Sequence, residues 1–237
     1  MQAASFLFAT CDDGWPMRNV LFKFGHEGTL LSHLFSYLIF FILILFFCFS
    51  ANLKASEEID SHENLFMDAS EAYKNGSYSE AFEKFDVLAN LGFHDAQYNL
   101  AVILKSGKGI PKDYSEALYW SWRARLGGVE LAIDQSEELI DYVPEKVLKD
   151  IRTRVLTSLD ERISKGDSSA IIRLANYFLV ILDEPDYEKA YLWFLVSAAL
   201  LQDGGLEGRD EVEAQLESEK IIKIQKEAYD LFLNLPK

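Results

Sequence analysis

The sequence predicts an all-α fold in which antiparallel helix hairpins are stacked in tandem after one hydrophobic helix near the N-terminus. The tetrapeptide Tyr-Ser-Glu-Ala occurs at residues 78–81 and again at 114–117, a separation that is typical of helical repeats. Within the repeated segments the apolar residues recur every three to four positions, which indicates helices rather than strands. The hydrophobic helix is predicted from the uncharged run of residues 34–49.

The composition excludes several classes of function. The chain has 237 residues, with 38 acidic against 23 basic side chains and a formal net charge of −15. Nucleic-acid binding needs clustered Lys and Arg to displace phosphate counterions, and no such cluster occurs, so we expect no nucleic-acid partner. Both cysteines, Cys11 and Cys48, precede residue 50, which excludes a disulfide scaffold or a cysteine-ligated zinc site in the remainder of the chain.

The N-terminal part divides into a leader region at residues 1–29, a hydrophobic segment at 30–50 and a linker at 51–62. About twenty apolar residues in a helix span roughly 30 Å, the thickness of a bilayer core. Arg18 and Lys23 precede this segment and an acidic stretch follows it. The positive-inside rule then places the N-terminus in the cytoplasm and the remainder of the chain across the membrane.

Two interpretations of the hydrophobic segment stay open, a cleaved signal sequence and a retained transmembrane helix. The run is slightly longer than a usual signal core and a little short for a span. Cleavage after Ser50 or Ala55 would use a weak site in either case. We expect an exported protein, either periplasmic or anchored in the inner membrane with its repeats outside the cytoplasm, and an uncut segment would make the membrane a partner.

Three repeated segments follow the linker. Residues 63–92 are predicted to form a single hairpin that precedes two longer units. Residues 94–166 and 168–237 are predicted to be two copies of one four-helix unit.

Two internal matches support this division. Residues 186–190 match 113–117 at an offset of 73, and 218–223 match 144–149 at an offset of 74. Because both offsets are about twice the hairpin period, each copy is expected to bring a second hairpin with it.

The residues of these segments resemble a known family. The stretch AQYNLAVILKSGKGIPKDYSEALYWSWRARLGG, residues 96–128, closely resembles the Sel-one-like repeat (SLR), and residues 65–92 resemble the related tetratricopeptide repeat. The third copy departs from the pattern because its turn reads LDEPDY, without Gly-x-Gly. The resemblance implies a right-handed α-solenoid whose inner surface binds other proteins, and bacterial members of the family are often exported.

No catalytic constellation is recognised, and we expect no catalytic residue, no cofactor and no metal. Gly107-Lys108-Gly109 lacks the strand and the ending of a phosphate loop, so we interpret it as a helix-to-helix turn. The four histidines are scattered without metal-ligand spacing; they are His26, His33, His62 and His94. Family members with β-lactamase activity depend on paired cysteines in each repeat, and this chain has none there.

The resemblance also suggests a protein-binding groove, since the first helix of each hairpin lines the concave face in tetratricopeptide arrays. With Leu100, Ala101 and Leu104 facing the core, the opposite face of residues 95–105 presents a mixed surface suited to a peptide or a helix. The candidate groove residues in this copy are Asp95, Tyr98, Val102 and Lys105. Their equivalents in the third copy are Ser169, Ile172, Asn176 and Leu179.

Tryptophans add a further candidate. Trp120 and Trp193 occupy equivalent repeat positions and are expected in the core. Trp122 is predicted to lie on another face of the same helix, where it is free to anchor a partner.

The function predicted from the sequence is a non-catalytic, exported or membrane-anchored scaffold for protein–protein interaction, in the bacterial cell envelope. One alternative is an assembly or regulatory subunit of the envelope. A less favoured one is a cell-wall hydrolase or β-lactamase-like enzyme, which would need converging carboxylates, and Glu71 and Glu116 are the residues to inspect for it.

Overall fold

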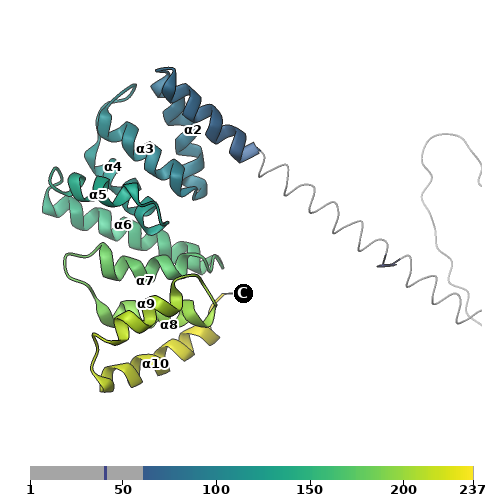
Figure 1. Cartoon of the computed structure of the whole chain (residues 1–237), viewed down its shortest axis with the longest axis vertical. Coiled ribbons are helices and arrows are strands. Elements are labelled where there is room, and N and C mark those ends of the chain that lie inside the picture. Colours follow the sequence, from purple (N-terminus) through teal and green to yellow (C-terminus); the bar gives the residue numbers. More distant parts are fainter. Residues whose placement is uncertain (1–39, 42–60, 237) are drawn as a thin grey trace, which may run out of the picture. The chain divides into compact units, whose positions relative to one another are not determined.

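The computed structural model describes residues 40–41 and 61–236, and the fold presented here belongs to the unit Glu58–Lys237. Figure 1 shows this unit as a succession of helices, and its described residues contain no strand, which confirms the all-α prediction. A helix that contains residues 61–74 comes first. It is followed by α2 (Tyr78–Leu91), α3 (His94–Ser106), α4 (Tyr114–Leu126), α5 (Leu131–Ile140), α6 (Glu145–Ser164), α7 (Ala170–Val180), α8 (Tyr187–Ala199), α9 (Gly205–Glu213) and α10 (Ser218–Leu233).

The hydrophobic helix predicted at residues 30–50 lies outside the described residues, except for Phe40 and Phe41, which are helical. Across 40–41 and 61–236, no helix combines the length and the hydropathy that a membrane crossing requires.

Successive helices pack against each other along the unit. α3 packs on α4 and α7 packs on α8, while α2–α3, α4–α5, α6–α7 and α8–α9 contacts join neighbouring pairs. Helix α4 has the most neighbours: it touches α3, α5, α6 and α7, whereas α7 touches α4, α6 and α8, and α8 touches α7, α9 and α10. Fully buried alanines let the backbones approach closely; they include Ala69, Ala81, Ala96, Ala101, Ala117, Ala170, Ala175 and Ala190.

The turns are determined by a few local residues. Gly107 and Gly109 both have positive φ angles, 68° and 76°, which glycine adopts at little cost, so the turn interpretation of this motif is confirmed. A Cβ on Gly109 would lie 2.6 Å from the Cβ of Tyr78, and Ser79 donates a hydrogen bond to the Gly109 carbonyl at 2.7 Å. The loop before α4 is thereby held against the start of α2.

One prediction about the tryptophans is wrong. Trp120 is buried as expected, and Trp193 is partly buried against the core. Trp122, however, is only 1% exposed, and the guanidinium of Arg152 lies 5.8 Å from its ring centroid. The reason is that neighbours cover α4 on several faces, and a helix that is apolar all round is buried rather than amphipathic. Trp122 therefore offers no surface to a partner.

Candidate functional site

The candidate site is a cleft of about 630 Å³ formed by α3, α5, the start of α4 and the turn after α5. Its lining combines aromatic, aliphatic and charged side chains. They are Tyr98, Val102, Lys105 and Ser106 of α3, Lys112 and Tyr114 at the start of α4, and Leu131, Asp134, Gln135, Glu138 and Tyr142 of α5 and the turn after it.

Helical periodicity explains why these residues share a cleft. On α3 the positions of Leu100, Ala101 and Leu104 are buried in the core, so the intervening positions face outward over the adjacent turn. On α5 the core positions are Ala132 and Leu139. The outer faces of two neighbouring helices therefore make the two sides of the hollow.

An aromatic pair forms one wall. The rings of Tyr114 and Tyr142 are stacked, with centroids 4.8 Å apart and an interplanar angle of 21°. Lys112 lies over the Tyr114 ring with its Nζ 5.7 Å from the centroid. Tyr142 and Leu131 stay largely exposed although both are large and apolar. Exposed aromatic and aliphatic surface that lines a concave site is typical of a binding surface.

Charges of both signs surround this wall. Lys105 of α3 and Glu138 of α5 form an ion pair. Lys112 and Asp134 add one further charge of each sign. The cleft has no net excess of either charge, which distinguishes it from the acidic surface of the chain as a whole.

Gln135 supplies a polar group at the cleft. The residue is buried, and its Oε1 has no hydrogen-bond partner among the described residues. A buried acceptor without a donor costs about 1–3 kcal/mol relative to a satisfied one.

The structure places the predicted groove residues of the second copy in two different hollows. Tyr98, Val102 and Lys105 line the α3/α5 cleft. Asp95 instead lies at a smaller hollow of about 410 Å³, beside Phe93 and the helix of residues 61–74.

The predicted residues of the third copy do not contribute to the cleft. Ser169 precedes α7 and donates to the Asp167 carboxylate at 2.5 Å. The Asn176 side chain donates to the Ile172 carbonyl at 3.0 Å, and Leu179 is half-buried against the core. None of these four side chains lines the α3/α5 cleft.

Sequence reasoning missed the α5 side of the cleft, including Leu131, Gln135 and Tyr142. The only available signal was the apolar periodicity of residues 131–140, which predicts a helix but not its neighbour. That α5 packs next to α3 depends on the stacking of the second hairpin, which no repeat motif specified.

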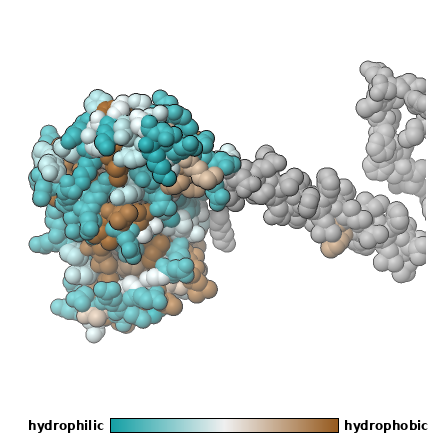
Figure 2. All heavy atoms as spheres, turned by 45° about the horizontal axis from the view of Figure 1, so that its top comes forward, coloured by the Kyte–Doolittle hydropathy of each residue, from teal (hydrophilic) through white to brown (hydrophobic). Residues whose placement is uncertain are grey.

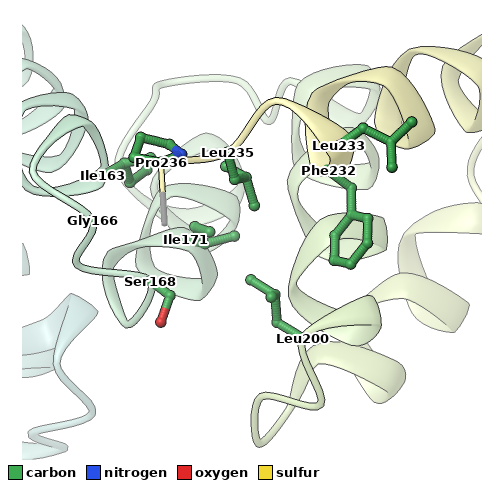
Figure 3. Close-up of a pocket in the computed structure, with 9 residues that line it drawn as sticks. All are labelled: Ile163, Gly166, Ser168, Ile171, Leu200, Phe232, Leu233, Leu235 and Pro236. Atoms are coloured by element: carbon green, nitrogen blue, oxygen red, sulfur yellow. The ribbon is translucent and has the colours of Figure 1, made fainter. Parts of the chain in front are cut away.

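A third hollow, mostly apolar and of about 370 Å³, lies between the α6–α7 turn and the end of α10. Figure 3 shows Ile171, Leu200 and Phe232 approaching one another there from three segments, with Ser168 as the polar side chain. Figure 2 shows apolar patches separated by hydrophilic surface on this unit. This hollow has few polar groups to orient a ligand, so it is less specific than the α3/α5 cleft.

The carboxylates of the hydrolase alternative have other surroundings. Glu116 accepts two hydrogen bonds from Arg154, at 2.6 and 3.2 Å. Glu71 is exposed on the helix of residues 61–74. Within the part of the chain that the structure describes, no group of three or more His, Cys, Asp or Glu side chains could hold a metal ion.

The chain matches a family model, two curated proteins and a solved structure. The Sel1 repeat family matches residues 94–124 and 168–200. The "DAP3-binding cell death enhancer 1" of Rattus norvegicus is 30% identical over 131 residues, 54% of this chain and 25% of the rat protein. Its counterpart from Mus musculus is 42% identical over 48 residues, 20% of this chain and 9% of the mouse protein. The chain thus spans at most a quarter of the length of these relatives.

Among solved structures, a protective antigen of uropathogenic Escherichia coli that displays an SLR fold is 18% identical, with a TM-score of 0.34. The alignment covers 72% of this chain and 30% of the antigen. The family matches at 94–124 and 168–200 coincide with α3–α4 and α7–α8. The resemblance seen in the residues is confirmed: this chain carries Sel1 repeats.

Proposed function

We propose that this chain is a protein-interaction scaffold whose α3/α5 cleft binds a segment of a partner protein. The observation that carries the proposal is the exposed apolar surface at Leu131 and Tyr142, which lines a concave site together with charges of both signs. Apolar contact supplies binding free energy, and the charged groups of the lining orient the bound segment.

The lining specifies the chemistry of the partner segment. An aromatic or branched aliphatic side chain fits against Tyr114, Tyr142 and Leu131. Charged groups on the segment can meet Lys112 on one side and Asp134 on the other, so they fix the register more than the affinity.

Relatives support the class of function. The curated relatives from rat and mouse have names that describe binding to another protein, DAP3. Because the alignments cover a quarter or less of those proteins, DAP3 is a first probe for this chain and not an assigned partner. We infer a non-catalytic role from the Sel1 repeats, which serve typically as scaffolds.

The proposed compartment depends on the hydrophobic segment at residues 30–50 alone. Export, with the repeats beyond a membrane, follows from its apolar length and from the charges that flank it. The two mammalian relatives give no support to a bacterial envelope in particular. Cell fractionation combined with N-terminal sequencing tests the proposal: a soluble cytoplasmic chain that retains residues 30–50 would contradict it.

Site-specific crosslinking tests the cleft. A photoreactive amino acid replaces Leu131 in the full chain, and the same replacement at Val87, which is exposed on α2, is the position control. We expect a discrete protein adduct from position 131 and none of that size from position 87.

Two tyrosine variants make the test specific. Tyr142→Ala removes one ring of the cleft wall and should weaken formation of the adduct about tenfold, because truncation of an aromatic anchor in an interface costs more than about 1 kcal/mol. Tyr229→Ala, the same change at an exposed position of α10, should leave it unchanged. Equal adduct yields from both variants would exclude the cleft as the binding site.

A further inference from the structure

Three arginines from three helices gather in one place. Arg123 lies in the last turn of α4, Arg162 in the last turn of α6, and Arg173 near the start of α7. These three helices contact one another, and Figure 1 shows α6 and α7 side by side. Burial lowers the pKa of His94 at the start of α3, and the charges of all three arginines lower it further. The pKa of Arg173 is likewise lowered by burial and by the charges of Arg162 and Arg123.

The carboxylate within this arginine cluster is already occupied. Asp167 Oδ2 accepts from Arg162 Nε at 2.6 Å, and Arg162 Nη2 also lies 2.6 Å from it. Asp167 Oδ1 accepts from the backbone N–H and the hydroxyl of Ser169. Neither Arg123 nor Arg173 forms an ion pair within the part of the chain that the structure describes. Three guanidinium groups and one carboxylate thus leave the cluster with a charge of +2, in a chain whose formal net charge is −15.

Structural roles account for two of the arginines but not for the third. A cation in the last turn of a helix is stabilised by the helix dipole, as at Arg123 and Arg162. Arg123 also lies over the Trp120 ring, 5.1 Å from its centroid, and donates to the Tyr119 hydroxyl at 3.3 Å.

Arg173 has the opposite surroundings. It lies close to the N-terminus of α7, where the helix dipole disfavours a cation. Its Nη1 is buried and has no hydrogen-bond acceptor among the described residues. A partly buried cation beside two like charges lowers the stability of the ligand-free chain. Such a cost is typical of a residue that is kept for a ligand.

We propose that Arg123, Arg162 and Arg173 bind a phosphate group. A phosphate monoester carries about −1.5 to −2 charges near pH 7, which matches the charge of the cluster, whereas a carboxylate would neutralise only half of it. Guanidinium groups can donate two parallel N–H bonds to phosphate oxygens. All three side chains are partly exposed, so the cluster is within reach of a ligand from solvent. A nucleic acid would bring many further phosphates against an acidic surface, so one phosphate group is the better fit.

The arginine cluster is separate from the α3/α5 cleft. Arg123 and His94 lie at the end of α4 and at the start of α3, whereas the cleft is lined by later residues of α3 and by the start of α4. These are opposite ends of the α3–α4 hairpin, whose helices of 13 residues are each about 20 Å long. The phosphate site therefore does not rest on the function proposed for the cleft, and Tyr142→Ala should leave phosphate binding unchanged.

Titration calorimetry with inorganic phosphate tests the site, with the full chain in a mild detergent and a phosphate-free buffer. Arg173→Met removes the charge and keeps an unbranched stem. It should weaken phosphate binding about tenfold or more, because charge-assisted hydrogen bonds to the phosphate oxygens are lost. Arg209→Met is the matched control on α9, where the arginine pairs with Asp210, and it should bind phosphate as the unaltered chain does.

Urea denaturation separates a ligand site from a structural role. Without phosphate, Arg173→Met should unfold at the same urea concentration as the unaltered chain or at a higher one, because the change removes repulsion between like charges. Saturating phosphate should raise the midpoint of the unaltered chain and raise that of Arg173→Met less. A variant that is less stable without phosphate and binds phosphate normally would make Arg173 a structural residue and overturn the proposal.

Two sources of the phosphate group are distinguished by titrating phosphoserine with blocked ends beside inorganic phosphate. Tighter binding of phosphoserine supports a site for a phosphorylated side chain of a partner, and tighter binding of inorganic phosphate supports a site for the free ion. Acetate, which carries one charge, should bind more weakly than either. The proposal is overturned by equal phosphate affinity in Arg173→Met and Arg209→Met, by the absence of saturable binding of both phosphates, or by acetate binding as tightly as they do.

Discussion

At the scale of single residues, His94 holds the junction of α2, α3 and α4. The Gln97 amide donates to the Ala89 carbonyl at 3.0 Å, so its oxygen is turned toward His94 Nδ1, also at 3.0 Å. This pattern assigns the imidazole proton to Nδ1, which donates to Gln97. The ring lies against Gly127 at the end of α4, where a Cβ would come within 2.0 Å of the His94 Cγ.

Replacing Gly127 with Ala should destabilise the fold through this contact. The backbone at Gly127 is right-handed, with φ −83° and ψ −1°, so alanine brings no conformational strain of its own. The added methyl group overlaps the imidazole, and overpacking of this kind costs about 1–3 kcal/mol. Urea denaturation measures the loss. In a His94→Ala background the same change should cost much less, and an equal cost in both backgrounds would refute the assigned clash.

His94 also makes the stability depend on pH. Burial lowers the pKa of His94, the hydrogen bond to Gln97 opposes this effect, and the charges of Arg173, Arg162 and Arg123 lower the pKa further. The unfolded chain therefore binds the proton more readily than the folded chain. The free energy of unfolding should have its full value above the pKa of about 6.5 that His94 has in the unfolded chain. It should decrease as the pH falls below that value.

Unfolding experiments between about pH 7.5 and 5 check the direction of this effect. His94→Gln keeps a polar side chain without the titration, so its unfolding free energy should vary less over this range. If the variant keeps the full pH dependence, another group is responsible.

Some residues of the candidate site could be predicted from the sequence and others could not. Tyr98, Val102 and Lys105 follow from helical periodicity, and the structure places them in the cleft. The burial of Gln135 without a hydrogen-bond partner for its oxygen could not be predicted, because it depends on how α5 packs next to α3. Trp122 was misplaced because the number of neighbours around α4 is a property of the stack and not of the helix itself.

At the scale of elements, two helices begin in the same way. The Asp113 side chain accepts from the Glu116 N–H at 3.0 Å, and the Asp186 side chain accepts from the Lys189 N–H at 3.1 Å. Each satisfies one of the free donors at a helix start. The internal match of residues 113–117 with 186–190 is therefore a match of helix caps as well as of core positions.

Removing a cap should cost a defined amount. Asp113→Ala is expected to lower the free energy of unfolding by about 1 kcal/mol, and Asp113→Asn should preserve most of it because asparagine also caps helices. Chemical denaturation followed by circular dichroism gives both values. Equal losses for alanine and asparagine would mean that the charge, and not the capping hydrogen bond, stabilises α4.

The helices themselves could be predicted well because each carries local information, an apolar period and a start or stop residue. Gly92, for example, ends α2 with a φ of 99°, and its N–H bonds back to the Ala89 and Leu88 carbonyls. What local information does not contain is which outer faces become neighbours. The cleft depends on that packing, so it emerges only from the structure.

At the scale of the whole unit, Arg152 of α6 connects the helices of residues 94–166 to those that follow. Its guanidinium lies over the Trp122 ring of α4, and its Nε donates to the Ile181 carbonyl at the end of α7, at 3.2 Å. It also forms an ion pair with Asp183. The Arg152 carbonyl accepts from the Tyr177 hydroxyl at 3.0 Å. A side chain that is 11% exposed thus joins α4, α6 and α7.

Arg152→Ala should weaken the coupling between the two sets of helices. In stacked repeats, stability is the sum of the stability of each repeat and the contacts between neighbours, so loss of a contact between units lowers cooperativity. We expect a loss of about 1–3 kcal/mol and a smaller urea m-value, with tryptophan fluorescence and circular dichroism no longer changing together. Arg154→Ala is the control, because Arg154 pairs with Glu116 of α4 on the same side of that junction and is half exposed. In Arg154→Ala the free energy of unfolding should fall by less than about 1 kcal/mol, and the two signals should still change together. A single cooperative transition with an unchanged m-value in Arg152→Ala would contradict the prediction. It would show that the hydrophobic contacts of α6 and α7 couple the units by themselves.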